Sequence, residues 1–190
     1  MKWFWCAVLL IWLAGCGAHL PQTELSLKGN KHPCRVAVLP FANETGDFRV
    51  GRLIYRVFLS QLIASHEFQV VEEGRIRNFL RLERCLVGKE PPPRVLRTMG
   101  ERLGVEAIIG GTVLEAKEDR QGVFLSLSIW VRDAKEGQLL WSTYHSRRGD
   151  DYQKIFHFGR ILTLTRLSEK MVQEILADWQ KKNLGGCQQR

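Results

Sequence analysis

The sequence predicts an α/β (α+β) sandwich, in which a mixed sheet that includes a C-terminal β-hairpin packs against amphipathic helices. From Val123 to Arg132, apolar residues alternate with polar or aromatic ones, and a second alternating segment, GQLLWSTYHS, follows the turn DAKEG. Two alternating runs joined by a short turn are typical of a hairpin. Other segments place apolar residues at helical spacing instead, which gives each of them one apolar face. Strands and amphipathic helices around one core indicate a layered domain.

The first half of the domain alternates short strands with helices. A compact apolar run, RVAVLPF at 35–41, is followed by the turn residues NETGD and predicts a buried strand. The apolar face of the helix that follows consists of Leu53, Ile54, Val57, Phe58 and Leu62. After a short strand over 68–73 (FQVVEE), a second helix is expected, with an apolar face made of Ile76, Phe79, Leu80 and Leu82.

Proline and glycine delimit a third helix. Pro93 suits a first helical position, and Gly104 suits the end of the segment RVLRTMGERLG. The next segment, VEAIIGGTVLEAKE, predicts a strand that leaves the core, because its apolar density falls toward Lys117. The hairpin follows, and a last helix is expected from about Asp151, with a break allowed near Gly159. Its apolar face should pack on the sheet and comprises Met171, Val172, Ile175, Leu176 and Trp179. The predicted order is β-α-β-α-α-β-β-β-α.

The N-terminal residues 1–15, MKWFWCAVLLIWLAG, have the plan of a secretory signal peptide. Lys2 is their only charge, an apolar stretch runs from Trp3 to Ala14, and small residues end the segment. A permanent membrane helix needs about 20 apolar residues, so this run is too short to be one. We therefore expect an exported protein.

The four residues Leu13-Ala14-Gly15-Cys16 resemble the bacterial lipoprotein box. In that box a diacylglycerol is attached to the cysteine sulfur, the peptidase cuts before the cysteine, and the freed amine is acylated. We therefore predict lipidation, with palmitate among the acyl chains, at Cys16; the alternative is an ordinary signal peptide with a chance cysteine. Two or three acyl chains, at about 0.8 kcal/mol per buried CH₂, hold a protein durably on a bilayer.

The predicted location is the outer membrane, periplasmic face, of a Gram-negative bacterium, with the chain anchored by lipid. Gly17 rather than an aspartate follows the cysteine, which in enterobacterial-type sorting favours transfer to the outer membrane. We expect a signal peptide at 1–15, a lipidated N-terminus and tether at 16–34, a single α/β domain at 35–182 and a flexible tail at 183–190. Residues 17–34 show no sustained periodicity and contain Pro, Gly and Asn, as linkers do.

The net charge is +8 over 190 residues, and removal of Lys2 with the signal peptide lowers it to +7. A basic surface suits an anionic envelope polymer such as peptidoglycan or lipopolysaccharide, or is simply solvated. No basic run is interleaved with aromatic residues, so no nucleic-acid partner is expected.

No catalytic residue, cofactor site or metal site is predicted from a motif. The pair Gly110-Gly111 lies inside a strand and lacks the lysine of a phosphate loop, so close packing or a bulge is the better interpretation. His145 and His157 could meet in space beside Asp151, which leaves an exported hydrolase as an alternative, although Asp150-Asp151 most simply caps the last helix.

Three cysteines besides Cys16 belong to the mature chain: Cys34, Cys85 and Cys187. An exported compartment permits disulfides. One pair with a free thiol and no pair at all both remain open, and Cys34 with Cys187 is the pair to test first, because both flank the core elements.

The segments RVAVLPFANETGD, FQVVEEGRIRNFL, LGVEAIIGGTVLEAKE and LSLSIWVRDAKEGQLLWS occur in this order. Over 35–176 they resemble the curli secretion-channel lipoprotein superfamily and its relatives. These relatives include the N-terminal domain of the Tol-system propeller protein, flagellar outer-membrane lipoproteins, and lipoprotein activators of penicillin-binding proteins. Asp133, Gly137 and Trp141 match a family pattern in which a strand ends at Asp, turns at Gly and returns through Trp-Ser.

The resemblance implies a periplasmic, non-enzymatic protein that works by assembly or partner contact, including self-association. Channel-forming members carry extra amphipathic hairpins. Here the segment with Lys89, Glu90 and Pro91–Pro93 is short, and the one over 116–122 is shorter still. A secretion-channel subunit is therefore the lesser alternative, and a membrane-anchored, non-catalytic assembly or partner-binding module of the cell envelope is the expected function.

Overall fold

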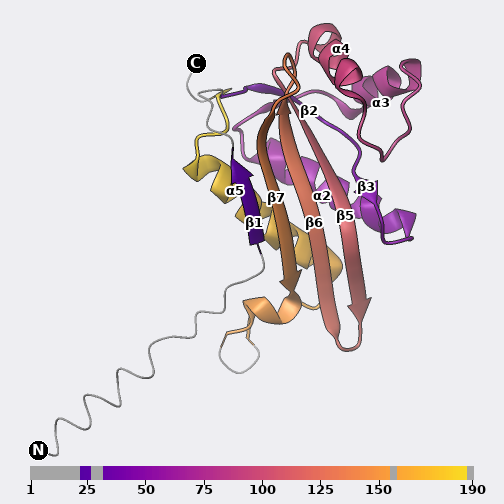
Figure 1. Cartoon of the computed structure of the whole chain (residues 1–190). Helices are drawn as coiled ribbons and strands as arrows, with labels where there is room; N and C mark the ends of the chain where they lie inside the picture. The colour runs from indigo at the N-terminus through magenta and orange to yellow at the C-terminus, as the bar shows by residue number, and fades with distance from the viewer. Residues whose placement is uncertain (1–21, 27–31, 155–157, 188–190) are drawn as a thin grey trace, which may run out of the picture.

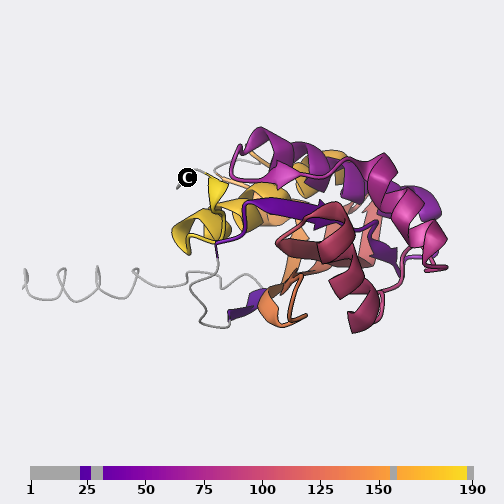
Figure 2. The same cartoon turned by 90° about the horizontal axis from the view of Figure 1, so that it is seen from above.

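The computed structural model describes residues 22–26, 32–154 and 158–187. A central sheet is flanked by helices on both faces (Figure 1 and Figure 2). Helices α2 (Phe48–Ala64) and α5 (Leu164–Lys181) pack in one hydrophobic core with the sheet. Helices α3 (Glu73–Leu82) and α4 (Pro93–Leu103) form a second core on its other face. The predicted α+β sandwich is confirmed.

The sheet is mixed, as expected. Its strands are β1 (Gln22–Ser26), β2 (Arg35–Val38), β3 (Ala42–Asn43), β4 (Gln69–Val70), β5 (Ala107–Asp119), β6 (Gly122–Asp133) and β7 (Leu139–Arg148). They are arranged in the order β1-β7-β6-β5-β2-β4, and β3 pairs with β5 beyond the end of β2. The pairs β1–β7, β7–β6 and β6–β5 are antiparallel, whereas β2 runs parallel to both β5 and β4. The parallel part is the part that helices cover on both faces, which is where parallel strands are normally found.

Strand β2 illustrates why an apolar run becomes a central strand. Val36 and Val38 point into the core of α2 and α5, whereas Ala37 and Leu39 belong to the core of α3 and α4. All four are at most 4% exposed. Because both faces of β2 are buried, its sequence has no polar alternation.

The helix boundaries of α4 and the apolar face of α5 are confirmed. Pro93 occupies the first turn of α4, and Gly104 ends the helix in the left-handed conformation with φ +64°, which glycine adopts without steric cost. The five residues predicted to face the sheet from α5 are all buried. Leu82, which was predicted to belong to the apolar face of α3, is instead 65% exposed.

The segment predicted to be a tether contains a strand. Residues 22–26 form β1, which pairs antiparallel with β7, with Gln22 opposite His145 and Ser26 opposite Trp141. Part of the segment expected to be a tether over 16–34 is therefore a strand of the sheet. An added edge strand is held by backbone hydrogen bonds to the open edge of its neighbour, so it needs no hydrophobic periodicity.

The short segment over 116–122 consists mostly of strand residues. Strand β5 continues to Asp119, and Arg120-Gln121 connect it directly to β6, so β5 and β6 form a second, longer hairpin. The side chains near its tip are exposed, which explains the falling apolar density. The backbone ladder continues regardless of what the side chains contact.

The last helix begins later than expected. Residues 149–152 form a short 3₁₀ helix, η1, and α5 starts at Leu164 after the N-cap Thr163, whose side chain accepts a hydrogen bond from the Arg166 amide. Asp151 therefore caps η1 rather than α5: it accepts a hydrogen bond from the Arg148 amide at 2.6 Å. In the part of the chain that the structure describes, no helix combines the length and the apolar character needed to cross a membrane.

Candidate functional site

The parallel part of the sheet contains a topological switch point. The chain leaves β2 for α2 on one face, and it leaves the neighbouring β4 for α3 on the opposite face. Adjacent parallel strands whose connections diverge leave a crevice outside their carboxyl ends, and ligands of open α/β sheets bind there. A pocket of about 410 Å³ lies at this position, between α2, Arg77 of α3 and the segment containing Val87 and Gly88. We call it the switch-point crevice.

The turn between β3 and α2 forms one wall of the crevice and is held rigidly. Asn43 Oδ1 accepts hydrogen bonds from the Thr45 amide at 3.2 Å and the Thr45 hydroxyl at 2.8 Å, and its Nδ2 donates to the Asp47 carbonyl at 2.7 Å. Asp47 then caps α2 by accepting from the Arg49 amide at 2.9 Å. A Cβ at position 51 would lie 2.8 Å from Cβ of Asn43, so Gly51 permits this close approach.

Apolar side chains project from the rim of the switch-point crevice. Phe48 on α2 is 72% exposed and Val87 is 58% exposed. The Arg52 guanidinium lies over the Phe48 ring at 6.0 Å, a cation–π arrangement. Exposed aromatic and aliphatic groups beside a crevice are typical of a binding surface.

The polar groups of the switch-point crevice favour binding of an anion. Arg52 has no carboxylate partner among the described residues, whereas Arg77 donates to Glu73 at 2.5 Å. Tyr55 donates its hydroxyl proton to the Val38 carbonyl at 3.4 Å, and burial raises the pKa of Tyr55, so the ring stays neutral. The described lining contains neither a histidine, a cysteine nor a carboxylate. The arrangement can therefore hold an apolar group next to an anion, and it does not assemble an acid–base pair.

The three residues of the hydrolase alternative lie as follows. His145 is completely buried on β7, and Asp151 caps η1 beyond the end of that strand. His157 lies outside the described residues. In the described ranges, His, Cys, Asp and Glu form no group of three that could hold a metal ion.

A buried polar cluster on the α5 face was missed by the sequence analysis. Arg147, whose side chain is 4% exposed, donates from Nε to Glu174 at 3.0 Å, and the Tyr152 hydroxyl donates to the other Glu174 oxygen at 2.7 Å. Burial and the bond to Glu174 raise the pKa of Tyr152, so it remains a donor. The sequence did contain a signal for this cluster: Arg147 is six residues after Trp141 on β7, so its side chain points to the same, core-facing side of the strand. We call these three residues the Glu174 cluster.

The glycine pair and the family-like turn are structural. The ring of Trp130 lies directly over Gly110, and the ring of Phe41 lies over Gly111, which confirms the interpretation of close packing. Asp133 ends β6 and accepts hydrogen bonds from two amides of the following turn, while Gly137 has φ +71°.

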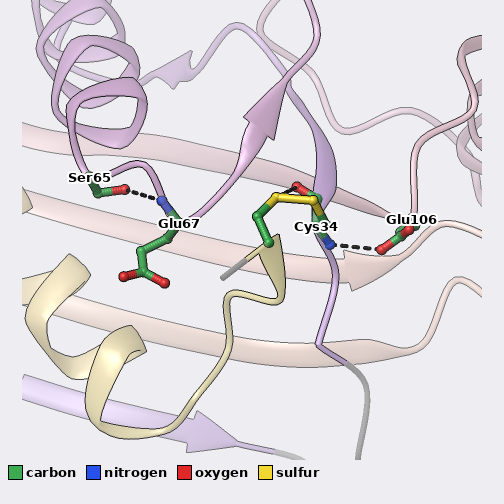
Figure 3. Close-up of a disulfide and its surroundings, with 5 residues drawn as sticks. Cys34, Ser65, Glu67 and Glu106 are labelled. Carbon is green, nitrogen blue, oxygen red and sulfur yellow. Dashed lines mark hydrogen bonds between the residues drawn. A yellow bond between two sulfur atoms is a disulfide. The ribbon is translucent and has the colours of Figure 1, made fainter. Parts of the chain in front are cut away.

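Cys34 and Cys187 form a disulfide that joins the start of β2 to the end of the chain (Figure 3). The Cys34 amide donates to the Glu106 carboxylate at 2.7 Å, and the Gly186 amide donates to the Pro33 carbonyl at 3.2 Å. Residues 183–187 are therefore attached to the domain, which corrects the expected flexible tail at 183–190 for these five positions. Cys85 is a free thiol, and burial raises its pKa.

Replacing Cys34 with serine is expected to lower the free energy of unfolding of the oxidised protein by about 2–4 kcal/mol. The bond spans 153 positions in sequence, and cross-links that close long loops restrict the unfolded chain most. Urea unfolding measures the change. Cys85→Ser is the control that removes a thiol without opening a loop; an equal loss in both variants would contradict the prediction.

The fold and the switch-point crevice together define the class of protein domain: it is a small α/β domain with a mixed sheet and an open crevice at the switch point of that sheet. No protein-family model and no curated protein matches the chain in sequence. Among solved structures, the chain is similar to the PelC L103M dodecamer from Paraburkholderia phytofirmans, with 13% identity, a TM-score of 0.57, and coverage of 84% of this chain and 96% of PelC.

Two further solved structures are also similar. For lipoprotein GNA1162 from Neisseria meningitidis the identity is 18% and the TM-score 0.51, over 76% of this chain and 97% of that one. For the hypothetical protein CT253 from Chlamydia trachomatis they are 13% and 0.52, over 76% and 94%. The chain therefore shares its fold with PelC, lipoprotein GNA1162 and CT253.

Proposed function

We propose that this protein is a lipid-anchored, non-catalytic partner-binding module on the periplasmic face of the outer membrane. The lipoprotein box at Cys16, which lies outside the described residues, supports the anchor. The fold shared with PelC and lipoprotein GNA1162 supports an envelope lipoprotein. The proposed partner is an envelope protein or a second copy of this chain.

The observation that carries the partner-binding role is the switch-point crevice with its exposed rim. Phe48 and Val87 offer apolar surface, and Arg52, which has no carboxylate partner in the described ranges, offers a charge-assisted donor next to it. An arginine beside an apolar pocket can bind a carboxylate of a partner segment while the pocket binds the apolar side chain that precedes this carboxylate. We therefore propose a partner segment in which an apolar residue precedes an acidic group or a chain terminus.

The distribution of charge gives less support to binding of an anionic polymer. Some of the basic side chains are in ion pairs with carboxylates, namely Arg49, Arg77, Arg102, Arg132, Arg147, Arg160 and Arg166 together with Lys117 and Lys181. Paired charges create a mixed surface rather than a single strong positive field.

Anchoring is tested by metabolic labelling with palmitate. The wild-type protein is expected to incorporate the label and to fractionate with outer membranes, whereas Cys16→Ser should incorporate none, because only the thiol forms the thioether. Cys85→Ser is the matched control and should label like the wild type. Equal labelling of Cys16→Ser would contradict the anchor.

Partner binding is tested by photo-crosslinking in intact envelopes. A photoreactive side chain at position 48 or 87 is expected to give a discrete crosslinked species, and Arg52→Glu should weaken it by reversing the charge beside the crevice. Position 63, which is 52% exposed at the other end of α2, is the matched control. Equal crosslinking at position 63, or a product unaffected by Arg52→Glu, would contradict the role of the crevice.

A further inference from the structure

Strand β1 determines where the anchored end of the chain meets the domain. Because Gln22 pairs with His145 and Ser26 with Trp141, β1 runs away from the end of β7 at Arg148. The chain therefore enters β1 from the end of the sheet where the β5–β6 turn and η1 are located (Figure 1). We call this end the hairpin end and define it as residues 117–124, 148–154 and 158–163.

The reach of the chain before β1 is similar to the distance by which the sheet extends past Gln22. Five residues lie between Cys16 and Gln22. The six Cα–Cα steps, at about 3.5 Å each, span at most about 21 Å. Gln22 and Leu127 of β6 both pair with His145 of β7, so they lie level with each other across the sheet. From Leu127, β6 extends five residues further to its first residue, Gly122. At about 3.3 Å per residue, the sheet therefore extends about 17 Å past Gln22 toward the anchored end. A lipid surface that holds Cys16 thus lies within reach of the hairpin end.

The hairpin end presents two apolar side chains to solvent. Phe158 is 74% exposed and Leu162 is 61% exposed. Their backbone is hydrogen-bonded to η1 and to the residues that follow it: the Lys154 amide donates to the Phe158 carbonyl at 2.6 Å, and the Ile161 amide donates to the Gly149 carbonyl at 3.1 Å. Arg160 also donates to the Gln121 carbonyl of the β5–β6 turn at 2.9 Å. The two apolar groups are therefore presented on a defined support.

The charges at the hairpin end are compatible with a lipid headgroup region. Arg120 and Lys154 are exposed and have no ion-pair partner among the described residues. The same end carries four carboxylates, those of Glu118, Asp119, Asp150 and Asp151. Asp150 pairs with Arg160, and Glu118 accepts from the Leu164 amide at 2.7 Å. Apolar groups flanked by free cations are typical of surfaces that lie in a membrane interface.

We propose that the hairpin end lies on the lipid surface and that Phe158 and Leu162 insert into its interface. This inference rests on the proposed lipid anchor at Cys16. It orients the domain, because β1 and β4 form opposite edges of the sheet. The switch-point crevice is then on the edge of the sheet opposite the tether. Asn43 of the crevice pairs with Val113, which is level with Gln22 across the sheet, so the crevice lies about as far from the lipid surface as the start of β1.

The test uses the full lipidated protein in vesicles of phosphatidylethanolamine and phosphatidylglycerol. In a Cys85→Ser background, an environment-sensitive fluorophore is attached to Phe158→Cys. Leu86→Cys is the matched control: Leu86 is 66% exposed, but it lies between α3 and α4, the helices of the second core, and not at the hairpin end. The label at 158 is expected to shift to shorter emission wavelength and to be quenched by brominated acyl chains. The label at 86 should show neither effect.

Emission at 158 that matches emission at 86 would overturn the proposal. A blue shift at 158 without quenching by brominated lipid would also overturn it, because a protein rather than lipid would then cover Phe158. Palmitate incorporation into each preparation is measured first. Its absence would refute the anchor and the orientation together, whereas incorporation without quenching would refute the orientation alone.

Discussion

Glu174→Ala is expected to lower the free energy of unfolding by about 2–4 kcal/mol, somewhat less than the loss of one partner of a fully buried ion pair, because the Glu174 side chain is 28% exposed. Glu174 accepts from Arg147 at 3.0 Å and from Tyr152 at 2.7 Å. A single carboxylate thus connects β7, η1 and α5. Its removal takes a carboxylate away from a guanidinium that is 4% exposed, and water cannot fully replace that carboxylate.

Two further variants separate the contributions at this cluster. Tyr152→Phe removes one hydrogen bond and is expected to lower the stability by only about 1 kcal/mol. Glu169→Ala is the matched control on the same helix: Glu169 pairs with the exposed Arg166, and an exposed pair contributes about 0–1 kcal/mol. Thermal and urea unfolding measure all three. A loss for Glu174→Ala no larger than that for Glu169→Ala would show that the buried pair is not stabilising.

Trp179→Ala is expected to destabilise the domain by about 3–5 kcal/mol, the usual range for removing a large buried aromatic side chain. Trp179 is 1% exposed, and its ring makes edge-to-face contacts with Phe58, Phe68 and Trp141 at centroid distances of 5.2–6.0 Å. These rings come from α2, the segment before β4, and β7, so one side chain fills the space where these elements meet α5. For a domain of this size the melting temperature should fall by roughly 6–20 °C.

Trp179→Phe tests whether packing or the indole N–H matters more. The structure gives the buried Nε1 no partner among the described residues, so phenylalanine removes an unsatisfied donor while it keeps most of the ring contacts. Its effect should be clearly smaller than that of alanine. Leu82→Ala is the surface control, since Leu82 is 65% exposed. Equal losses in the Phe and Ala variants would contradict the packing argument.

The elements that the sequence predicted correctly are those whose side chains contact one face of the core. The alternation from Val123 to Arg132 became β6, and the apolar spacing around Trp179 became α5, because burial on one side selects residues with the period of the element. Pro93 and Gly104 marked the two ends of α4 for a local reason, since each restricts or frees its own backbone dihedrals.

The elements that the sequence did not predict are held by the backbone. Strand β1 and the last residues of β5 pair through amides and carbonyls, which every residue possesses, so their side chains carry no periodic signal. Likewise, the start of the last helix was placed too early, because Asp151 is an equally good cap for the 3₁₀ helix as for an α-helix.

The sequence by itself predicted export and a lipid anchor, and it determined the layers of the domain. Its lipoprotein box needs only four adjacent residues and an apolar run, and the layers follow from periodicity. The switch-point crevice, the Glu174 cluster and the position of the anchored strand beside the hairpin end were decided by the tertiary structure alone. The physical reason is that each brings together groups that are distant in sequence, such as Phe48 with Val87 and Arg147 with Glu174, and no local pattern encodes such distances.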